Sequence, residues 1–351
     1  MNKNIKQYGN NTQIIKKLQG KTIFLCTIAT TETSTTPGIT AAGATPELTL
    51  YTPALDAELL VRNEPVSAPE IPQTELDGTT CLTPGIITKG ALELTNTPFI
   101  VANAGSQIIP QIPHITINTT PGKNINTGKA VTNPEEIYKK AKILGQQLSQ
   151  TLDYITLAES LPAGTTTALG TLTALGYDAK NKVSGSAPEN PHPLKNQLVE
   201  TGLKKAKITP GKCTPYEAVA AVGDPMLIAT AGIILGSNKP ILLAGGTQLT
   251  AALALVKAIK PNYNFTNICQ ATTPYVVNDK TSNILNITQQ ISPDITIFSA
   301  DPEFEKSQNP GLQVYTTGSV KEGVGAGGAI FLALLQGKTT QEIRKNIEKL
   351  A

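Results

Sequence analysis

KTIFLCTIA, residues 21–29, is a continuous apolar run rich in β-branched residues, typical of a β-strand buried on both faces. Similar runs recur at residues 98–105, 240–246, 265–271, 294–300 and 312–317. Between them lie segments with the apolar spacing of helices, at 134–152, 165–175, 225–235, 248–259 and 326–335. Alternating buried strands and helices predict an α/β fold with a mostly parallel sheet and helices on both faces. In such sheets ligands bind at the carboxyl ends of the strands.

The bulk composition narrows the classes of function. A net charge of +3 over 351 residues gives no indication of a nucleic-acid surface. Arginine occurs only at Arg62 and Arg344, so backbone amides and lysines would have to hold any phosphate. The four cysteines form no CxxC pair and the two histidines have no ligand spacing, so no metal site is expected. A polar start and unpaired cysteines predict a cytoplasmic protein without a membrane partner.

Three segments depart from the strand and helix alternation. Residues 3–19 have the spacing of a short amphipathic helix. Residues 30–60 are rich in Thr, Pro and Ala and follow the first strand, where a substrate loop is expected. Residues 176–212 form a long polar segment, and loops of that length are usually lids or connectors.

The stretch AESLPAGTTTALGTLTALG, residues 158–176, is the first candidate for a site. Thr165 or Thr166 caps a predicted helix that Gly164 precedes. A helix start with free amides binds anions, and Glu159 just before it favours a sugar phosphate as the ligand. The structural alternative is an ordinary capped helix.

The stretch VYTTGSVKEGVGAGGAIFLALLQG, residues 314–337, places Glu322 before a run of small residues and an apolar helix. Gly323-x-Gly325-x-x-Gly328 matches the dinucleotide fingerprint, which leaves a dinucleotide-dependent oxidoreductase as one hypothesis. However, only 23 residues follow Gly328, too few for the rest of that βαβ unit. The glycines are interpreted as allowing Glu322 to approach a flat ligand, or alternatively as helix–sheet packing.

A third stretch, residues 240–259, joins a strand to a helix through Gly245-Gly246. It is either a tight connection or a ligand contact at Gly246. Two lysines, Lys195 in the long polar segment and Lys321 beside Glu322, are candidates for pairing with an anion, although a solvated surface position is the usual fate of a lysine.

Taken in order, these motifs resemble the nicotinate-nucleotide:dimethylbenzimidazole phosphoribosyltransferase family of cobamide biosynthesis. That family has a Glu-Met-Gly-Ile-Gly-Asn-Thr-Thr segment and a Gly-Glu-Gly-Thr-Gly-Ala segment, which residues 159–166 and 321–326 resemble. GKNINTGKAVT, which contains Asn124, is similar to its Gly-Thr-x-Asn-x-x-x-Gly-Pro-Ala-Met-Thr stretch. The resemblance extends over about residues 22 to 335.

The resemblance implies a Rossmann-like α/β domain over residues 21–325. It also implies a small helical portion from residues 1–20 and 326–351, and a homodimer. Glu322 matches the general base and Glu159 the second active-site carboxylate. The remaining residues with an implied role in binding phosphate or substrate are Gly164, Thr165, Thr166, Lys195, Gly246, Gly323, Gly325, Thr40 and Asn124.

Several positions depart from the family pattern. Lys321 stands where the family has Gly, and Ser160 to Ala163 replace its Met-Gly-Ile-Gly. Residues 29–34 replace an Ala-Asp-His-Gly-Val segment, and Asn103 stands where Asp is usual. The family's Ser and Gln that face the acceptor base fall near Thr40 and Leu48. These differences indicate a divergent branch whose acceptor preference is the least transferable property.

The implied reaction moves the phosphoribosyl group of nicotinate mononucleotide to a benzimidazole-type base, and it releases nicotinate. One carboxylate removes the N–H proton of the incoming base, and a second stabilises the developing positive charge on the sugar. No cofactor is implied. The alternative hypothesis keeps the fold and the phosphate site in a non-catalytic nucleotide- or base-binding protein.

Overall fold

The computed structural model describes residues 2–68, 74–76 and 78–351. Its centre is an eight-stranded sheet in the order β1, β10, β9, β8, β7, β2, β5, β6, in which only β1 pairs antiparallel to its neighbour. The strands are β1 (Ile5–Tyr8), β2 (Phe24–Ile28), β5 (Phe99–Asn103), β6 (Ile115–Thr116), β7 (Ile155–Ser160), β8 (Ile241–Ala244), β9 (Ile268–Thr272) and β10 (Thr296–Ala300). This architecture confirms the predicted α/β fold class.

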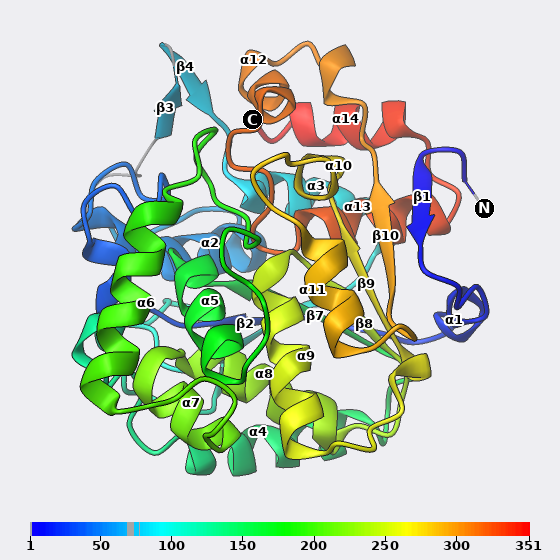
Figure 1. The fold of residues 1–351 in the computed structure, drawn as a ribbon. Helices are drawn as coiled ribbons and strands as arrows, with labels where there is room; N and C mark the ends of the chain where they lie inside the picture. The colour runs from blue at the N-terminus through cyan, green and yellow to red at the C-terminus, as the bar shows by residue number, and fades with distance from the viewer. Residues whose placement is uncertain (1, 69–73, 77) are drawn as a thin grey trace.

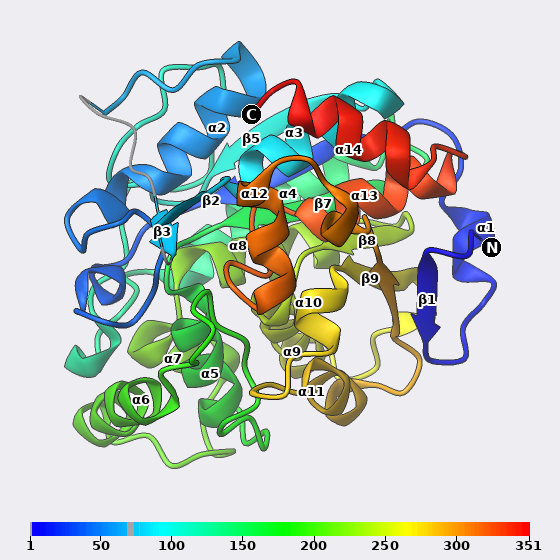
Figure 2. The same cartoon turned by 90° about the horizontal axis from the view of Figure 1, so that it is seen from above.

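Helices cover both faces of the sheet (Figure 1). One face carries α4 (Pro134–Leu148), α5 (Gly164–Ala174), α7 (Pro215–Val222), α8 (Pro225–Gly236) and α9 (Thr247–Ile259), with α6 (His192–Ala206) packed outside α5 and α7. The other carries α2 (Thr52–Arg62), α3 (Pro84–Thr95), α13 (Ala326–Leu335) and α14 (Thr340–Glu348). Figure 2 shows the two layers from above, with α2, α3, α13 and α14 on one side of the strands.

Strand β2 illustrates why the apolar runs form the sheet. Its side chains alternate, so that Phe24, Cys26 and Ile28 join the core under α3 and α13, whereas Leu25 joins the core under α8 and α9. Every residue of β2 is buried. A strand with a helical layer on each side must be apolar along its whole length, which is the pattern of residues 21–29.

Five of the six predicted strands and five of the six predicted helices are present, but the strand predicted at 312–317 is wrong. Those residues form α12 (Pro310–Gln313) and a 3₁₀ turn (Val314–Thr317). Asn309 starts them, because its side chain accepts a hydrogen bond from the amide of Gly311 at 2.8 Å. The apolar residues of this run, including Tyr315, are buried from a helical turn rather than from a strand.

The amphipathic helix predicted over residues 3–19 is also wrong. Residues 5–8 form β1, which pairs with the outer edge of β10, and the only helix nearby is the single turn α1 (Ile14–Lys17). The unpaired N–H and C=O groups along the edge of β10 form hydrogen bonds when β1 pairs with them, whereas a short isolated helix is only marginally stable. Strand β7 was not predicted from the sequence, and neither were α6, which lies inside the segment 176–212, and α2, which starts inside the segment 30–60 and ends at Arg62.

The division into a large domain and a small helical portion stays a prediction. At the two chain ends, β1 is a strand of the main sheet, α13 packs on that sheet, and α14 packs on α3. The remaining elements are the hairpin β3 (Thr74–Leu76) and β4 (Thr79–Cys81), and the helices α10 (Pro274–Val277) and α11 (Ile284–Ile291). Within the described part of the chain, no helix is long and apolar enough to cross a bilayer.

Candidate active site

A cavity of about 300 Å³ lies at the carboxyl end of the parallel sheet. The loops after β2, β7 and β8 reach it, as sheets of this kind predict. One part of its wall is apolar, made by α2, α3 and the segments near them: Leu55, Leu59, Leu82, Pro84 and Ile86. The opposite part is polar: Thr40, Gly164, Thr165, Ser184, Ser186, Thr247 and Gln248. The shape suits a ligand with a flat apolar part and a polar part.

Glu322 lies on the cavity wall, in the loop that precedes α13. Its Oε2 accepts hydrogen bonds from the Thr272 hydroxyl (2.7 Å) and the Thr273 amide (3.2 Å). Its Oε1 accepts from the amides of Gly323 (3.2 Å) and Gly327 (3.0 Å). Burial raises the pKa of Glu322, although these four donors favour the charged form. The carboxylate is therefore held firmly between the end of β9 and the start of α13.

One of these four donors is able to turn away from the carboxylate. The Thr272 hydroxyl donates to Oε2, but a hydroxyl rotates and accepts as readily as it donates. The three backbone amides cannot change roles. Rotation of the Thr272 hydroxyl therefore leaves a lone pair of Oε2 without a donor.

Glu159 is a second carboxyl group of the same wall, near the end of β7. Burial and the nearby charge of Glu322 raise the pKa of Glu159 to about 8, against a single hydrogen bond from the Leu161 amide at 3.2 Å. The turn Gly245-Gly246 lies between the two acids. A Cβ atom on Gly246 would lie 3.8 Å from Glu322 Cγ, and one on Gly245 would lie 3.9 Å from Glu159 Oε1. At neutral pH the pair therefore holds a proton on Glu159.

The start of α5 faces the same cavity through Gly164 and Thr165. Ala163 precedes it in a left-handed conformation (φ 59°), so the chain turns sharply from β7 into the helix. The positive end of the helix dipole lies there, which suits an anion, although the amides of Gly164 and Thr166 already donate to the carbonyls of Leu161 (3.1 Å) and Ala163 (2.8 Å). Thr166 is fully buried and does not line the cavity. The structure thus brings Glu322 and the predicted anion site to one cavity.

Lys195 lies behind Thr165 and is fully buried, although its polar surroundings in the sequence predicted a loop position. Its ammonium donates to three neutral oxygens, those of Thr165 Oγ1 (3.0 Å), the Ser184 carbonyl (2.7 Å) and Asn190 Oδ1 (2.8 Å). Burial, with the nearby charge of Lys321, lowers the pKa of Lys195 to about 7. Lys195 does not line the cavity, and these three oxygens take all of its N–H donors, so it acts on the start of α5 through Thr165.

The other predicted binding residues divide into two groups. Thr40, Gly246 and Gly323 line the cavity, and Thr40 Oγ1 lies 3.1 Å from Ser186 Oγ. Asn124 and Gly325 do not line it. The side chain of Asn124 instead donates to Thr36 Oγ1 at 3.2 Å, which ties two surface loops together.

Gly325 and the glycines after it serve packing. A Cβ atom on Gly325 would lie 2.6 Å from the Phe24 ring, one on Gly327 would lie 2.3 Å from the Thr272 carbonyl carbon, and one on Gly328 would lie 2.2 Å from Ala244 Cβ. The small residues therefore let α13 lie directly on the sheet. A 3₁₀ turn and a loop precede them instead of a strand, so the dinucleotide fingerprint lacks its βαβ context.

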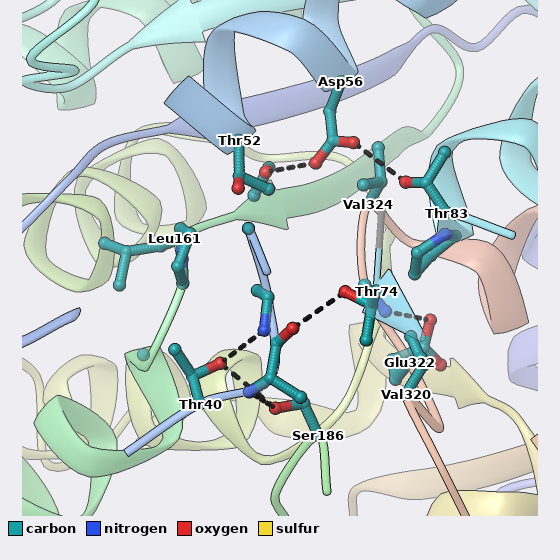
Figure 3. Close-up of a pocket in the computed structure, with 18 of the residues that line it drawn as sticks. Thr40, Thr52, Asp56, Thr74, Thr83, Leu161, Ser186, Val320, Glu322 and Val324 are labelled. Carbon is teal, nitrogen blue, oxygen red and sulfur yellow. Dashed lines mark hydrogen bonds between the residues drawn. The ribbon is translucent and has the colours of Figure 1, made fainter. Parts of the chain in front are cut away.

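Asp56 is a cavity residue that no sequence motif indicated. It lies on α2, buried, and its two carboxylate oxygens accept from Ser160 Oγ (2.8 Å) and Thr83 Oγ1 (3.1 Å). Figure 3 shows the bond between Asp56 and Thr83. Burial raises its pKa to about 6, with these two bonds opposing. Acids inside the apolar stretch TPALDAELL, which holds Asp56 and Glu58, were the signal that could have found it.

This fold also occurs in solved phosphoribosyltransferases. The nicotinate-nucleotide-dimethylbenzimidazole phosphoribosyltransferase of Thermus thermophilus matches 97% of this chain and 89% of its own length, with a TM-score of 0.57 and 16% sequence identity. A structure of CobT from the same organism matches with a TM-score of 0.54 and 17% identity, over 97% of this chain and 90% of that one. The class is thus an α/β protein with the fold of these phosphoribosyltransferases.

The relatives in sequence are UPF0284 proteins of archaea, and the chain belongs to the UPF0284 family. The protein of Methanothermobacter thermautotrophicus is 51% identical over 348 residues, which are 99% of this chain and 97% of that protein. The protein of Methanosarcina mazei is 43% identical, and that of Sulfolobus acidocaldarius 42%, each over 335 residues and about 95% of both chains. No family model matches the chain. The family therefore has the fold of these two solved structures at low sequence identity.

Proposed function

We propose that this protein transfers the phosphoribosyl group of nicotinate mononucleotide to a benzimidazole-type base, with release of nicotinate. The observation that carries the proposal is the placement of Glu322 and the start of α5 on one cavity wall. Phosphate binds at the start of α5, with the positive charge of Lys195 behind Thr165, while the flat acceptor lies against the apolar wall. The shared fold of the two solved phosphoribosyltransferases supports this reaction class.

In the proposed reaction, Glu322 removes the N–H proton of the acceptor, and the freed nitrogen lone pair attacks C1′ of the ribose. The bond between C1′ and the pyridinium nitrogen breaks, and its electron pair neutralises the pyridinium as nicotinate leaves. Attack from the opposite face inverts C1′ and gives an α-riboside 5′-phosphate. When the nucleotide binds, its pyridinium ring favours the charged form of Glu159, which releases its proton to solvent, and the carboxylate then stabilises the sugar cation.

The test is nicotinate release from nicotinate mononucleotide and dimethylbenzimidazole, measured by liquid chromatography with wild-type protein and Glu322→Gln. The substitution keeps the shape but removes the base, so we expect turnover to fall by about 10²–10⁴-fold. Binding of nicotinate mononucleotide, measured by calorimetry, should remain. A Glu322→Gln protein with wild-type turnover would exclude Glu322 as the base.

A second candidate function is a nucleotide- or base-binding protein that does not catalyse transfer. The observation that favours it is the full set of four donors on Glu322, which stabilises the carboxylate instead of leaving a free lone pair. Calorimetry separates the two functions. Tight binding of the nucleotide without nicotinate release, over a series of azole acceptors, would support the binding protein.

A further inference from the structure

The backbone that carries Glu322 is strained. Val320 (φ 62°), Lys321 (φ 61°) and Val324 (φ 52°) all lie in the left-handed region, which β-branched and long side chains rarely adopt. Such conformations persist only where neighbouring structure enforces them, and they concentrate at functional sites. Contacts with other parts of the chain must therefore hold the segment 320–324 in this shape.

The strongest of these contacts is a buried ion pair. Lys321 Nζ lies 2.9 Å from Asp279 Oδ2, and the two side chains are only 3% and 4% exposed. Lys321 Nζ also lies 3.3 Å from the carbonyl oxygen of Ala187. Asp279 follows α10 in the chain, so the pair joins the Glu322 segment to the loop beyond β9.

Backbone contacts support the same segment from two further sides. The amide of Val320 donates to the Ser186 carbonyl at 2.7 Å, and the Thr273 hydroxyl donates to the Lys321 carbonyl. Because Thr273 also donates its amide to Glu322, the loop after β9 holds both the carboxylate and the residue before it. The ion pair of Lys321 with Asp279 adds a further contact to the same segment.

Lys321 does not itself reach the ligand. It is absent from the cavity wall that Val320, Glu322 and Gly323 form, and its charge is already neutralised by Asp279. At a φ of 61° a glycine would be free of strain, so the lysine contributes through its side chain. Lys321 therefore affects Glu322 by fixing the backbone beside it, and it does not touch the substrate.

We propose that Lys321, through its buried ion pair with Asp279, is a positioning residue that fixes the Glu322 carboxylate against the cavity. The proposal rests on the proposed transfer reaction for its kinetic part. Removing the pair lets the strained segment relax, which moves the carboxylate away from the amides of Gly323 and Gly327.

The experiment compares Lys321→Met, the double variant Lys321→Met with Asp279→Asn, and Lys321→Arg. The double variant leaves no unpaired buried charge and therefore keeps the test valid if the single variant does not fold. We expect kcat to fall by about 100-fold while the KM for nicotinate mononucleotide changes by less than about twofold. Lys321→Arg, which keeps the cation, should recover part of kcat.

Two readouts distinguish positioning from a general structural role. In a Glu322→Gln background, adding Lys321→Met should cause no further loss of residual turnover, because Lys321 acts through Glu322. Hydrogen exchange of peptides that cover residues 318–327 should become faster in the double variant, whereas peptides from β8 and α9 stay unchanged.

Arg344→Met is the matched control. It breaks another ion pair, that of Arg344 with Glu303 at 3.4 Å, in a part of the chain that does not line the cavity. It should lower the melting temperature without changing kcat. Additive losses in the Glu322→Gln background, or wild-type exchange at 318–327, would overturn the proposal. If the wild type releases no nicotinate, the transfer reaction fails, and the exchange measurement alone decides whether Lys321 positions Glu322.

Discussion

Glu159 behaves differently from an ordinary glutamate because it is buried beside a second carboxylate. Its pKa of about 8 means that the folded protein keeps a proton that the unfolded chain loses near its usual pKa. Asp56 and Asp224 are also buried acids, and burial raises the pKa of each to about 6. Two of these three acids, Glu159 and Asp56, line the cavity.

This protonation predicts how stability depends on pH. Because Glu159 has a raised pKa in the folded state, the free energy of unfolding should fall as pH rises from about 4.5 to about 8. A tenfold difference in acid dissociation constant between the folded and unfolded states corresponds to about 1.4 kcal/mol. Urea denaturation of wild type and Glu159→Gln between these pH values checks it. The variant should lose less stability over this range, and identical slopes would contradict the raised pKa.

Among single residues, the sequence indicated the site residues whose type is unusual within a short motif. Glu322 and Glu159, with Gly164 and Thr165, are acids or helix-start residues beside turns, and all of them line the cavity. Asp56 was missed because its partners, Ser160 and Thr83, are distant in sequence and meet it only in the folded chain. Burial and hydrogen bonding depend on those long-range contacts.

Helix α13 shows how an element serves both packing and the site. Its first turn lies on the ends of β8 and β9 through Gly327 and Gly328, and the Gly327 amide also holds Glu322. A side chain here would push the helix off the sheet. The same contact therefore stabilises the fold and orients the carboxylate.

Gly327→Ala tests this double role. Its Cβ atom would lie 2.3 Å from the Thr272 carbonyl carbon, so the backbone must shift, at a cost of about 1–3 kcal/mol in stability. We expect a lower melting temperature together with reduced nicotinate release, because the amide that donates to Glu322 moves with the helix.

Gly337→Ala is the matched control for this substitution. Gly337 lies beyond the end of α13 with open space around it, and its φ of 84° makes alanine unfavourable there by about 1–2 kcal/mol. The control should therefore lower the melting temperature to a similar extent while turnover stays at the wild-type level. Equal turnover of Gly327→Ala and wild type would argue against coupling between packing and the site.

At the element scale, periodicity predicted most of the buried strands and helices but not the ends of the chain. The strand β1 forms because the edge of β10 needs a partner, which local spacing in residues 3–19 does not reveal. The helical turns at 310–317 start at a side-chain cap on Asn309. Both errors arise where a distant edge or a single cap decides the backbone.

For the whole molecule, the resemblance to the phosphoribosyltransferase family predicts a homodimer with the site near the subunit interface. Light scattering at several protein concentrations should then report twice the chain mass of 36.9 kDa. A monomer with full turnover would show that the cavity is complete in one chain. A monomer without turnover would indicate that a second copy is required.

The sequence by itself determined the α/β class and the identity of two site carboxylates, because apolar runs buried on both faces and acids beside glycine turns are local signals. Only the tertiary structure decided which residues share the cavity. It placed Asp56 on its wall, buried Lys195 behind Thr165, and paired Lys321 with Asp279. The physical reason is that burial, charge pairing and edge pairing are set by residues far apart in the chain, which no local pattern records.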